Sequence, residues 1–122
     1  MQEVVWQEEN NIEIQLYRDV TVEDMKNAVH QLESLCAQHD HVNVLLDTGG
    51  MDDYDPAIVK EHAEFYRKYK EKLNRFAVVS ESDFQRFLLE TFDKVSDTEI
   101  RTFTNAETDE ARKWIFPSRL PG

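Results

Sequence analysis

The chain has 122 residues, of which 40% are hydrophobic and 11% aromatic, so it suits one domain with a single buried core and is not a disordered chain. Its 25 acidic and 14 basic residues give a formal net charge of −11 at pH 7, which repels nucleic-acid phosphates and anionic membrane headgroups. The single cysteine, the lack of a signal-peptide pattern at the start and the absence of any apolar run near the ~20 residues that span a bilayer predict a cytoplasmic protein without a membrane span.

The first third of the chain predicts a β-hairpin followed by a helix. Strand-forming residues at 4–6 and an alternating segment over 12–17 flank turn chemistry at 9–11. Thr21 then precedes an apolar stripe at helical spacing, and its hydroxyl is placed to cap the free amides near Asp24. This stripe predicts the clearest helix of the chain.

Buried strands alternate with helices in the remaining two thirds. The apolar run over 42–46 predicts a strand, and the polar residues 47–55 that follow it predict a loop. Asp55 supplies a capping carboxylate and Pro56 a first helical position for the next helix. The elements expected after that helix are a strand over 76–79, a helix after Ser80, a strand over 100–103 and a helix from about 105.

This order predicts an α/β fold with a single mixed, mainly parallel sheet, an N-terminal antiparallel hairpin and about four helices. No repeat or linker divides the chain, so residues 1–115 are expected to form one domain and residues 116–122 a short tail. Trp114, with Ala111 and Ile115, is expected to form the apolar face that fixes the last helix to the sheet.

The sequence resembles the SpoIIAA-like family, which is related to STAS domains and to anti-sigma-factor antagonists. The residues that carry the resemblance occur in the expected order over nearly the whole chain, at 21–24, 44–47, 75–79, 101–103 and 111–115. The resemblance implies an α/β domain that binds a partner or a ligand and has no chemistry of its own.

One position departs from the pattern of anti-sigma-factor antagonists. They carry a phosphorylatable serine at the start of the helix that follows the central strand, where added charge switches partner binding. Residues 51–56 contain no serine here and are rich in aspartate instead. Thr48 carries the only hydroxyl of that type nearby, and a threonine at a strand end is more often a turn residue. The resemblance therefore predicts a regulatory module that lacks this phosphorylation switch.

Candidate binding residues follow from the sheet and from the helix after it. Ligands of open α/β sheets gather at the carboxyl ends of parallel strands, which are polar here. His62 falls on the inward stripe of its helix, either as a core histidine satisfied by hydrogen bonds or as a polar group in an aromatic pocket. The candidate set for a partner or ligand is Asp47, Thr48, Gly49, Asp55, His62 and Tyr66.

Three functions remain open on this evidence. The first is a non-enzymatic module that binds a protein, including a second copy of the chain as a homodimer, through residues 48–69. The second is a carrier or sensor of a small apolar, lipid-like ligand held between the sheet and the aromatic residues Phe65, Tyr66 and Tyr69. The third is an enzyme that uses His62 with Asp47 or Asp55, although no nucleophile accompanies them at a motif spacing.

Neither a metal nor another cofactor is expected. The carboxylates between residues 47 and 55 lack the spacing of a calcium-binding loop, and Asp55 already has a capping role. His39 and His41 provide only two ligands, which do not make a zinc site.

Overall fold

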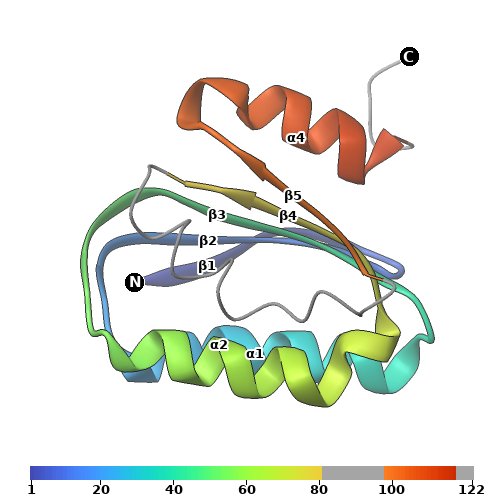
Figure 1. Cartoon of the computed structure of the whole chain (residues 1–122), viewed down its shortest axis with the longest axis horizontal. Coiled ribbons are helices and arrows are strands. Elements are labelled where there is room, and N and C mark those ends of the chain that lie inside the picture. Colours follow the sequence, from blue (N-terminus) through green and yellow to red (C-terminus); the bar gives the residue numbers. More distant parts are fainter. Residues whose placement is uncertain (81–97, 118–122) are drawn as a thin grey trace.

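Five strands form one sheet in which each strand lies beside the strand that precedes it in the chain (Figure 1). The computed structural model describes residues 1–80 and 98–117. In it, β1 (Gln2–Glu8) and β2 (Asn11–Val20) pair as an antiparallel hairpin. The three further strands continue the sheet in parallel from β2, and they are β3 (Val42–Tyr54), β4 (Leu73–Val79) and β5 (Glu99–Phe103). The predicted mixed, mainly parallel sheet with an N-terminal hairpin is thus confirmed.

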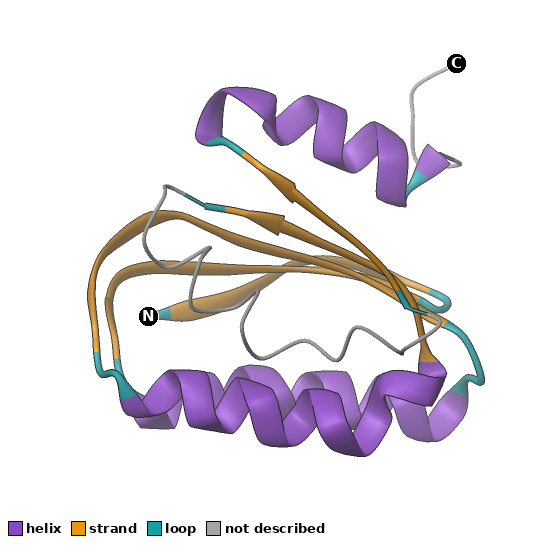
Figure 2. Ribbon diagram, viewed as in Figure 1, coloured by secondary structure: helices purple, strands orange, loops and turns teal. Residues whose placement is uncertain are grey.

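Helices cover both faces of this sheet, as a parallel sheet requires (Figure 2). One face packs against α1 (Val22–Gln38) and α2 (Ala57–Tyr69), and the other packs against α4 (Thr108–Ile115). Two short 3-10 turns, η1 (Lys70–Lys72) and η2 (Asn105–Glu107), precede β4 and α4. The described part of the chain therefore holds three α-helices, and the helix expected after Ser80 lies outside the described residues.

The alternation of side chains along the strands divides the core into two clusters. In β3, Val44 and Leu46 face the layer formed by α1 and α2, whereas Leu45 faces α4. The larger cluster also contains the buried side chains of α1 and α2, and the smaller one is closed by Ala111 and Ile115 of α4. Thus α1 and α2 bury one face of the sheet, and α4 buries part of the other.

Thr21 caps α1 as the sequence predicts. Its hydroxyl accepts a hydrogen bond from the Asp24 N–H at 3.1 Å, and the Asp24 carboxylate accepts one from the Thr21 N–H at 2.9 Å. This capping box satisfies two otherwise free amides at the helix start. It fixes the start of α1 directly after the last residue of β2.

β3 is longer than its apolar run predicts. The polar segment from Asp47 onward, expected as a loop, continues the strand to Tyr54. The reason lies in β2, which extends alongside and pairs Tyr17 with Gly50 and Val20 with Tyr54. The hydrogen-bonding groups of a neighbouring strand therefore hold in β conformation a segment whose side chains alone indicate a loop.

Two aromatic residues near the end of the described chain, Trp114 and Phe116, pack into the smaller core cluster. Trp114 is partly buried and packs against the cluster that contains Ala111 and Ile115, as expected for the apolar face of α4. Phe116, which the sequence pattern places in the tail, is 1% exposed, and its ring centroid lies 4.8 Å from that of Trp6. Phe116 therefore belongs to the packed core beside Ala111 and Ile115.

Arg18 is expected to destabilise the protein through its backbone conformation. It has a φ of 56° in β2, next to a shift in the register between β2 and β3. A residue with a Cβ atom in this left-handed region costs the folded state roughly 1–2 kcal/mol of stability, whereas glycine adopts the region without this steric cost. Arg18→Gly should therefore raise the free energy of unfolding by about 1 kcal/mol in urea denaturation. Arg18→Ala keeps the strained side-chain carbon and serves as the control; equal stabilities of the two variants would contradict the strain.

Candidate functional site

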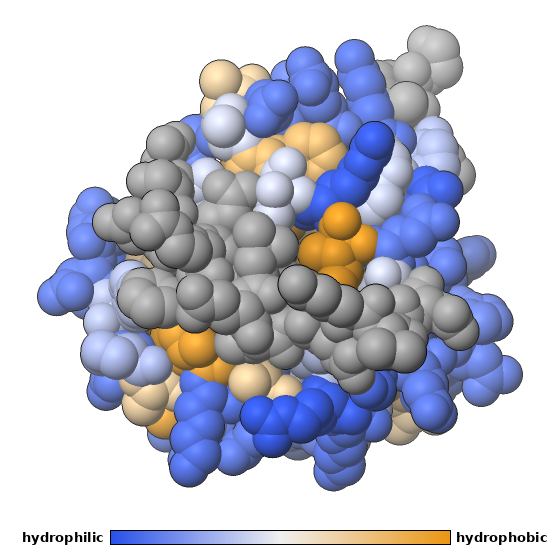
Figure 3. Space-filling model, viewed as in Figure 1, coloured by the Kyte–Doolittle hydropathy of each residue, from blue (hydrophilic) through white to orange (hydrophobic). Residues whose placement is uncertain are grey.

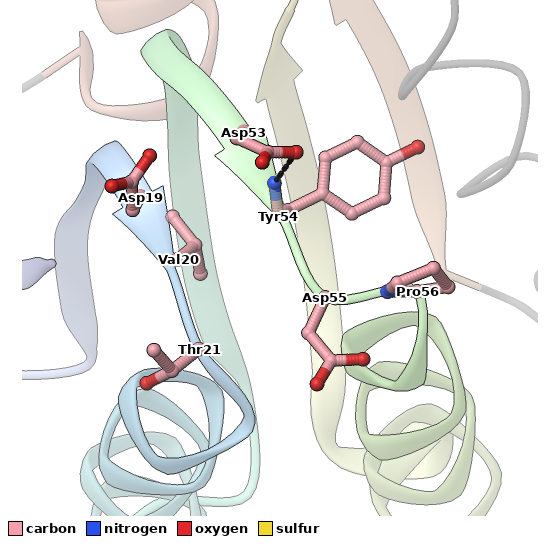
Figure 4. Close-up of a pocket in the computed structure, with 7 residues that line it drawn as sticks. All are labelled: Asp19, Val20, Thr21, Asp53, Tyr54, Asp55 and Pro56. Atoms are coloured by element: carbon pink, nitrogen blue, oxygen red, sulfur yellow. Dashed lines mark hydrogen bonds between the residues drawn. The ribbon is translucent and has the colours of Figure 1, made fainter.

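An open pocket lies where the carboxyl ends of β2 and β3 meet the first turns of α1 and α2 (Figure 4). It has a volume of about 470 Å³. An adjoining opening of about 510 Å³ extends it toward Val59 on α2. The two openings together are called the strand-end pocket, and its lining residues are Asp19, Val20, Thr21, Asp53, Tyr54, Asp55, Pro56 and Val59.

Backbone hydrogen bonds shape this pocket. The Asp55 N–H donates to the Val20 carbonyl oxygen at 3.0 Å, which joins the ends of β2 and β3. The Asp55 carboxylate then accepts a hydrogen bond from the Ala57 N–H at 2.9 Å, so it caps the first turn of α2. Both strands pass into helices within two residues, and this sharp transition leaves the side chains between them at the surface.

The strand-end pocket is acidic on one side and apolar on the other. Asp19, Asp53 and Asp55 are all exposed, and none of the described lysine and arginine residues lines the pocket. The apolar side consists of Tyr54, Pro56 and Val59, which line the second opening together. Within residues 1–80 and 98–117, no histidine, cysteine or serine belongs to the lining. Such a lining provides charge and packing contacts, which fit the recognition of a positively charged group with an apolar neighbour.

The predicted residues Asp47, Thr48 and Gly49 lie elsewhere, within β3 and beside the ends of β4 and β5. The Thr48 hydroxyl donates to the Val79 carbonyl oxygen at 2.7 Å, and the Gly49 N–H donates to the Asp47 carboxylate at 2.9 Å. The Asn105 side-chain amide donates to the Gly49 carbonyl oxygen at 3.1 Å. The expected strand ends therefore do converge, but these polar groups bind one another and hold η2 against β3.

Gly49 allows this close approach. A Cβ atom at this position would collide with the side chain of Asn105. Any residue other than glycine would displace the Asn105 side chain and disturb its hydrogen bond to the Gly49 carbonyl oxygen.

His62 and Tyr66 lie in the core between α2 and the sheet. They are 2% and 0% exposed, and the His62 ring meets the edge of the Phe76 ring with centroids 5.6 Å apart. Burial lowers the pKa of His62 to about 4, so the imidazole is neutral near pH 7. Of the six predicted site residues, only Asp55 lines the strand-end pocket.

A buried ion pair on the face of the sheet that α4 covers was not predicted from the sequence. Glu13 of β2 is 1% exposed, and Arg112 of α4 binds its carboxylate through Nε at 3.1 Å and Nη2 at 2.9 Å. The alternation of Ile12, Glu13 and Ile14 indicates a solvent-facing glutamate, because it does not show that α4 covers that face. Asp19 and Tyr54 of the strand-end pocket were missed as well.

Two further expectations concern metals and membranes. Residues 1–80 and 98–117 contain no group of three or more histidine, cysteine or acidic side chains placed to hold a metal ion. The expectation of a metal-free protein stays a prediction. Within the same residues, no helix combines the length and the apolar composition that crossing a membrane requires.

Comparisons with known proteins agree on the fold. A family model described as SpoIIAA-like matches residues 11–116. An uncharacterised protein from Shewanella loihica PV-4 with a SpoIIAA-like fold superposes with a TM-score of 0.68 at 15% identity, over 94% of this chain and 92% of that chain. The anti-sigma factor antagonist SpoIIAA in its unphosphorylated form superposes with a TM-score of 0.64 at 10% identity, over 90% of this chain and 96% of its own. No curated protein matches the sequence.

Proposed function

The chain belongs to the SpoIIAA-like family, and on this basis we propose that it is a non-enzymatic regulatory module that binds a partner protein at the strand-end pocket. The fold is that of a regulatory or binding module. The observation that carries the proposal is the position of the pocket, at the junction of β3 and α2. The family resemblance places the phosphorylatable serine of anti-sigma-factor antagonists at this junction.

At the junction of β3 and α2, this chain has aspartates in place of a serine. Asp53 and Asp55 stand before α2, and Asp19 lies at the end of the neighbouring strand β2 (Figure 4). A kinase switches a serine by adding about −1.5 to −2 charges, whereas an aspartate is charged at neutral pH in every state of the cell. The partner would therefore be recognised continuously, and regulation would depend on the amount of either protein.

The composition of the pocket indicates the chemistry of the partner. A lysine or arginine side chain on the partner would meet three carboxylates, and the stem of that side chain would pack on Tyr54, Pro56 and Val59. In Figure 3, the coloured part of the face in view is mainly hydrophilic, with apolar side chains in small, separate areas. The proposed partner surface is therefore basic with a small apolar part.

The two other functions have less support in the described residues. Of the three aromatic residues that would hold an apolar ligand, Phe65 and Tyr66 are 3% and 0% exposed and lie in the core with Phe76, and the partly buried Tyr69 stacks on Phe65. His62, which would act in an enzyme, is buried in the same cluster. Their side chains are thus engaged in packing within the protein, which supports a binding role for the pocket at the surface.

Charge reversal at the pocket tests the proposal. Asp19→Lys and Asp53→Lys should each reduce the recovery of the partner at least tenfold when the tagged chain is used for affinity capture and the recovered proteins are quantified by mass spectrometry. Both side chains are exposed, and neither caps a helix, so the variants should keep the wild-type melting temperature. Asp55 is left unchanged because its carboxylate holds the start of α2.

Asp40→Lys is the matched control for this experiment. Asp40 is also exposed, but it lies between α1 and β3, away from the residues of the pocket, and the substitution changes the net charge by the same amount. Equal recovery with all three variants, or recovery that falls equally with all three, would contradict a contact at the strand-end pocket.

A further inference from the structure

A second surface of the protein combines two arginines with a partly exposed tryptophan, far along the sheet from the hairpin. The guanidinium carbons of Arg75 on β4 and Arg101 on β5 each lie 5.2 Å from the centre of the Trp114 ring on α4. Phe103 of β5 adjoins the same ring, with centroids 6.3 Å apart. We call these four residues the Arg–Trp patch. The cluster of arginine and aromatic side chains is of the composition that dominates protein interfaces.

The two arginines of the Arg–Trp patch differ in their partners. Arg75 donates to the Trp114 carbonyl oxygen at 2.8 Å and forms an ion pair with Glu99 at 3.4 Å, so it supports α4 from within the protein. Arg101 is exposed, and its contact in the described part of the chain is the Trp114 ring alone. Among the described residues no carboxylate forms an ion pair with Arg101, and Glu99, two residues before it on the same face of β5, pairs with Arg75.

The strand that carries Arg101 also has a free edge. β5 is the last strand of the sheet and pairs with β4 on one side only within the described residues. Its outer backbone N–H and carbonyl groups can therefore pair with another extended segment. Arg101 and Phe103 point to the α4 face of the sheet, because their neighbours Ala77 and Val79 belong to the cluster under α4. Side chains of an added strand would alternate between this face and the opposite one.

From these observations we propose that an acidic, extended segment of a partner protein binds along the free edge of β5 and places a carboxylate on Arg101. Main-chain hydrogen bonds to β5 would hold the segment, and the Arg–Trp patch would select its side chains. Charge complementarity identifies the occupant, since the planar guanidinium of Arg101 offers two parallel N–H groups to an aspartate or glutamate. The contact with the Trp114 ring keeps the guanidinium in place before binding, so the Arg101 side chain loses less conformational entropy when the segment binds.

This surface is distinct from the strand-end pocket in place and in charge. The pocket lies at the ends of β2 and β3 and is acidic, whereas the patch lies on β4, β5 and α4 and is basic. The inference does not depend on the proposed function, because the two contacts involve different strands. A protein with both surfaces can hold a basic and an acidic partner at the same time.

A fluorescently labelled peptide of four Glu-Val repeats tests the inference by fluorescence anisotropy, with a peptide of four Lys-Val repeats as the second probe. The acidic peptide should bind, in spite of the negative net charge of the whole protein, at least tenfold more tightly than the basic one. Arg101→Gln should weaken this binding at least tenfold. Arg67→Gln removes an exposed arginine from α2, on the other face of the sheet, and should leave the affinity unchanged.

N-methylation of alternate residues of the acidic peptide tests the strand pairing, because it removes the amides that would bond to β5 while the charges remain. This peptide should also bind at least tenfold more weakly. Tighter binding of the basic peptide, equal losses in Arg101→Gln and Arg67→Gln, or full affinity of the N-methylated peptide would each overturn the proposal.

Discussion

Arg112→Ala should lower the free energy of unfolding by roughly 3–5 kcal/mol, a large part of the stability of a domain of this size. The substitution leaves the Glu13 carboxylate 1% exposed on a face of the sheet covered by α4, with both hydrogen bonds from the guanidinium removed. A buried charge without its partner costs more than the pair contributes when intact. Urea denaturation followed by circular dichroism measures the loss.

Two further variants show whether the unpaired charge is the cause. Lys113→Ala removes an exposed neighbouring cation on the same helix and should change the stability by less than about 0.5 kcal/mol. The double variant Glu13→Leu with Arg112→Leu removes both charges and should recover most of the loss. A cost below about 1 kcal/mol for Arg112→Ala would show that water or another group already satisfies Glu13.

Acidification should remove about 3 kcal/mol of stability between pH 6.5 and pH 4 through His62 alone. Burial lowers the pKa of the folded side chain from its ordinary value of 6.5 to about 4. Between these two values the unfolded chain binds a proton that the folded chain does not, so protonation favours unfolding. His62 therefore does not reduce the free energy of unfolding above pH 6.5. It reduces this free energy progressively as the pH is lowered, and the reduction stops growing below the folded pKa.

The effect is isolated by comparing variants, since carboxylates also titrate as the pH falls. His62→Phe keeps the bulk of the ring and should have a flatter profile of unfolding free energy between pH 6.5 and pH 4 than the wild type. His62→Gln provides the same comparison if phenylalanine disturbs the packing. His30 is exposed, and His30→Gln should retain the wild-type profile. Parallel profiles for the wild type and both His62 variants would contradict a buried, neutral imidazole.

The fold could be predicted from the sequence because its signals are local. The alternation at residues 12–17, the capping pair Thr21 and Asp24, and the apolar run 42–46 each identify an element from its own residues. Their order then requires crossover helices and a parallel sheet, which the structure confirms.

The features that the sequence did not predict depend on neighbours far along the chain. The polar half of β3 is a strand because β2 extends beside it, and Glu13 is buried because α4 covers it. The candidate site was predicted only in part for the same reason. Asp55 was found from its capping position, whereas Asp19 reaches the pocket from the end of another strand.

The order of the strands has a consequence for how the protein emerges from the ribosome. Each strand pairs with the one synthesised just before it, so the sheet can grow in step with translation, from the hairpin onward. Glu13 of β2, in contrast, waits for its partner Arg112, which follows 99 positions later. Until α4 is made, this carboxylate faces water on the uncovered side of the nascent sheet. A charge that must be buried in the finished molecule therefore protects its unfinished face from aggregation during synthesis.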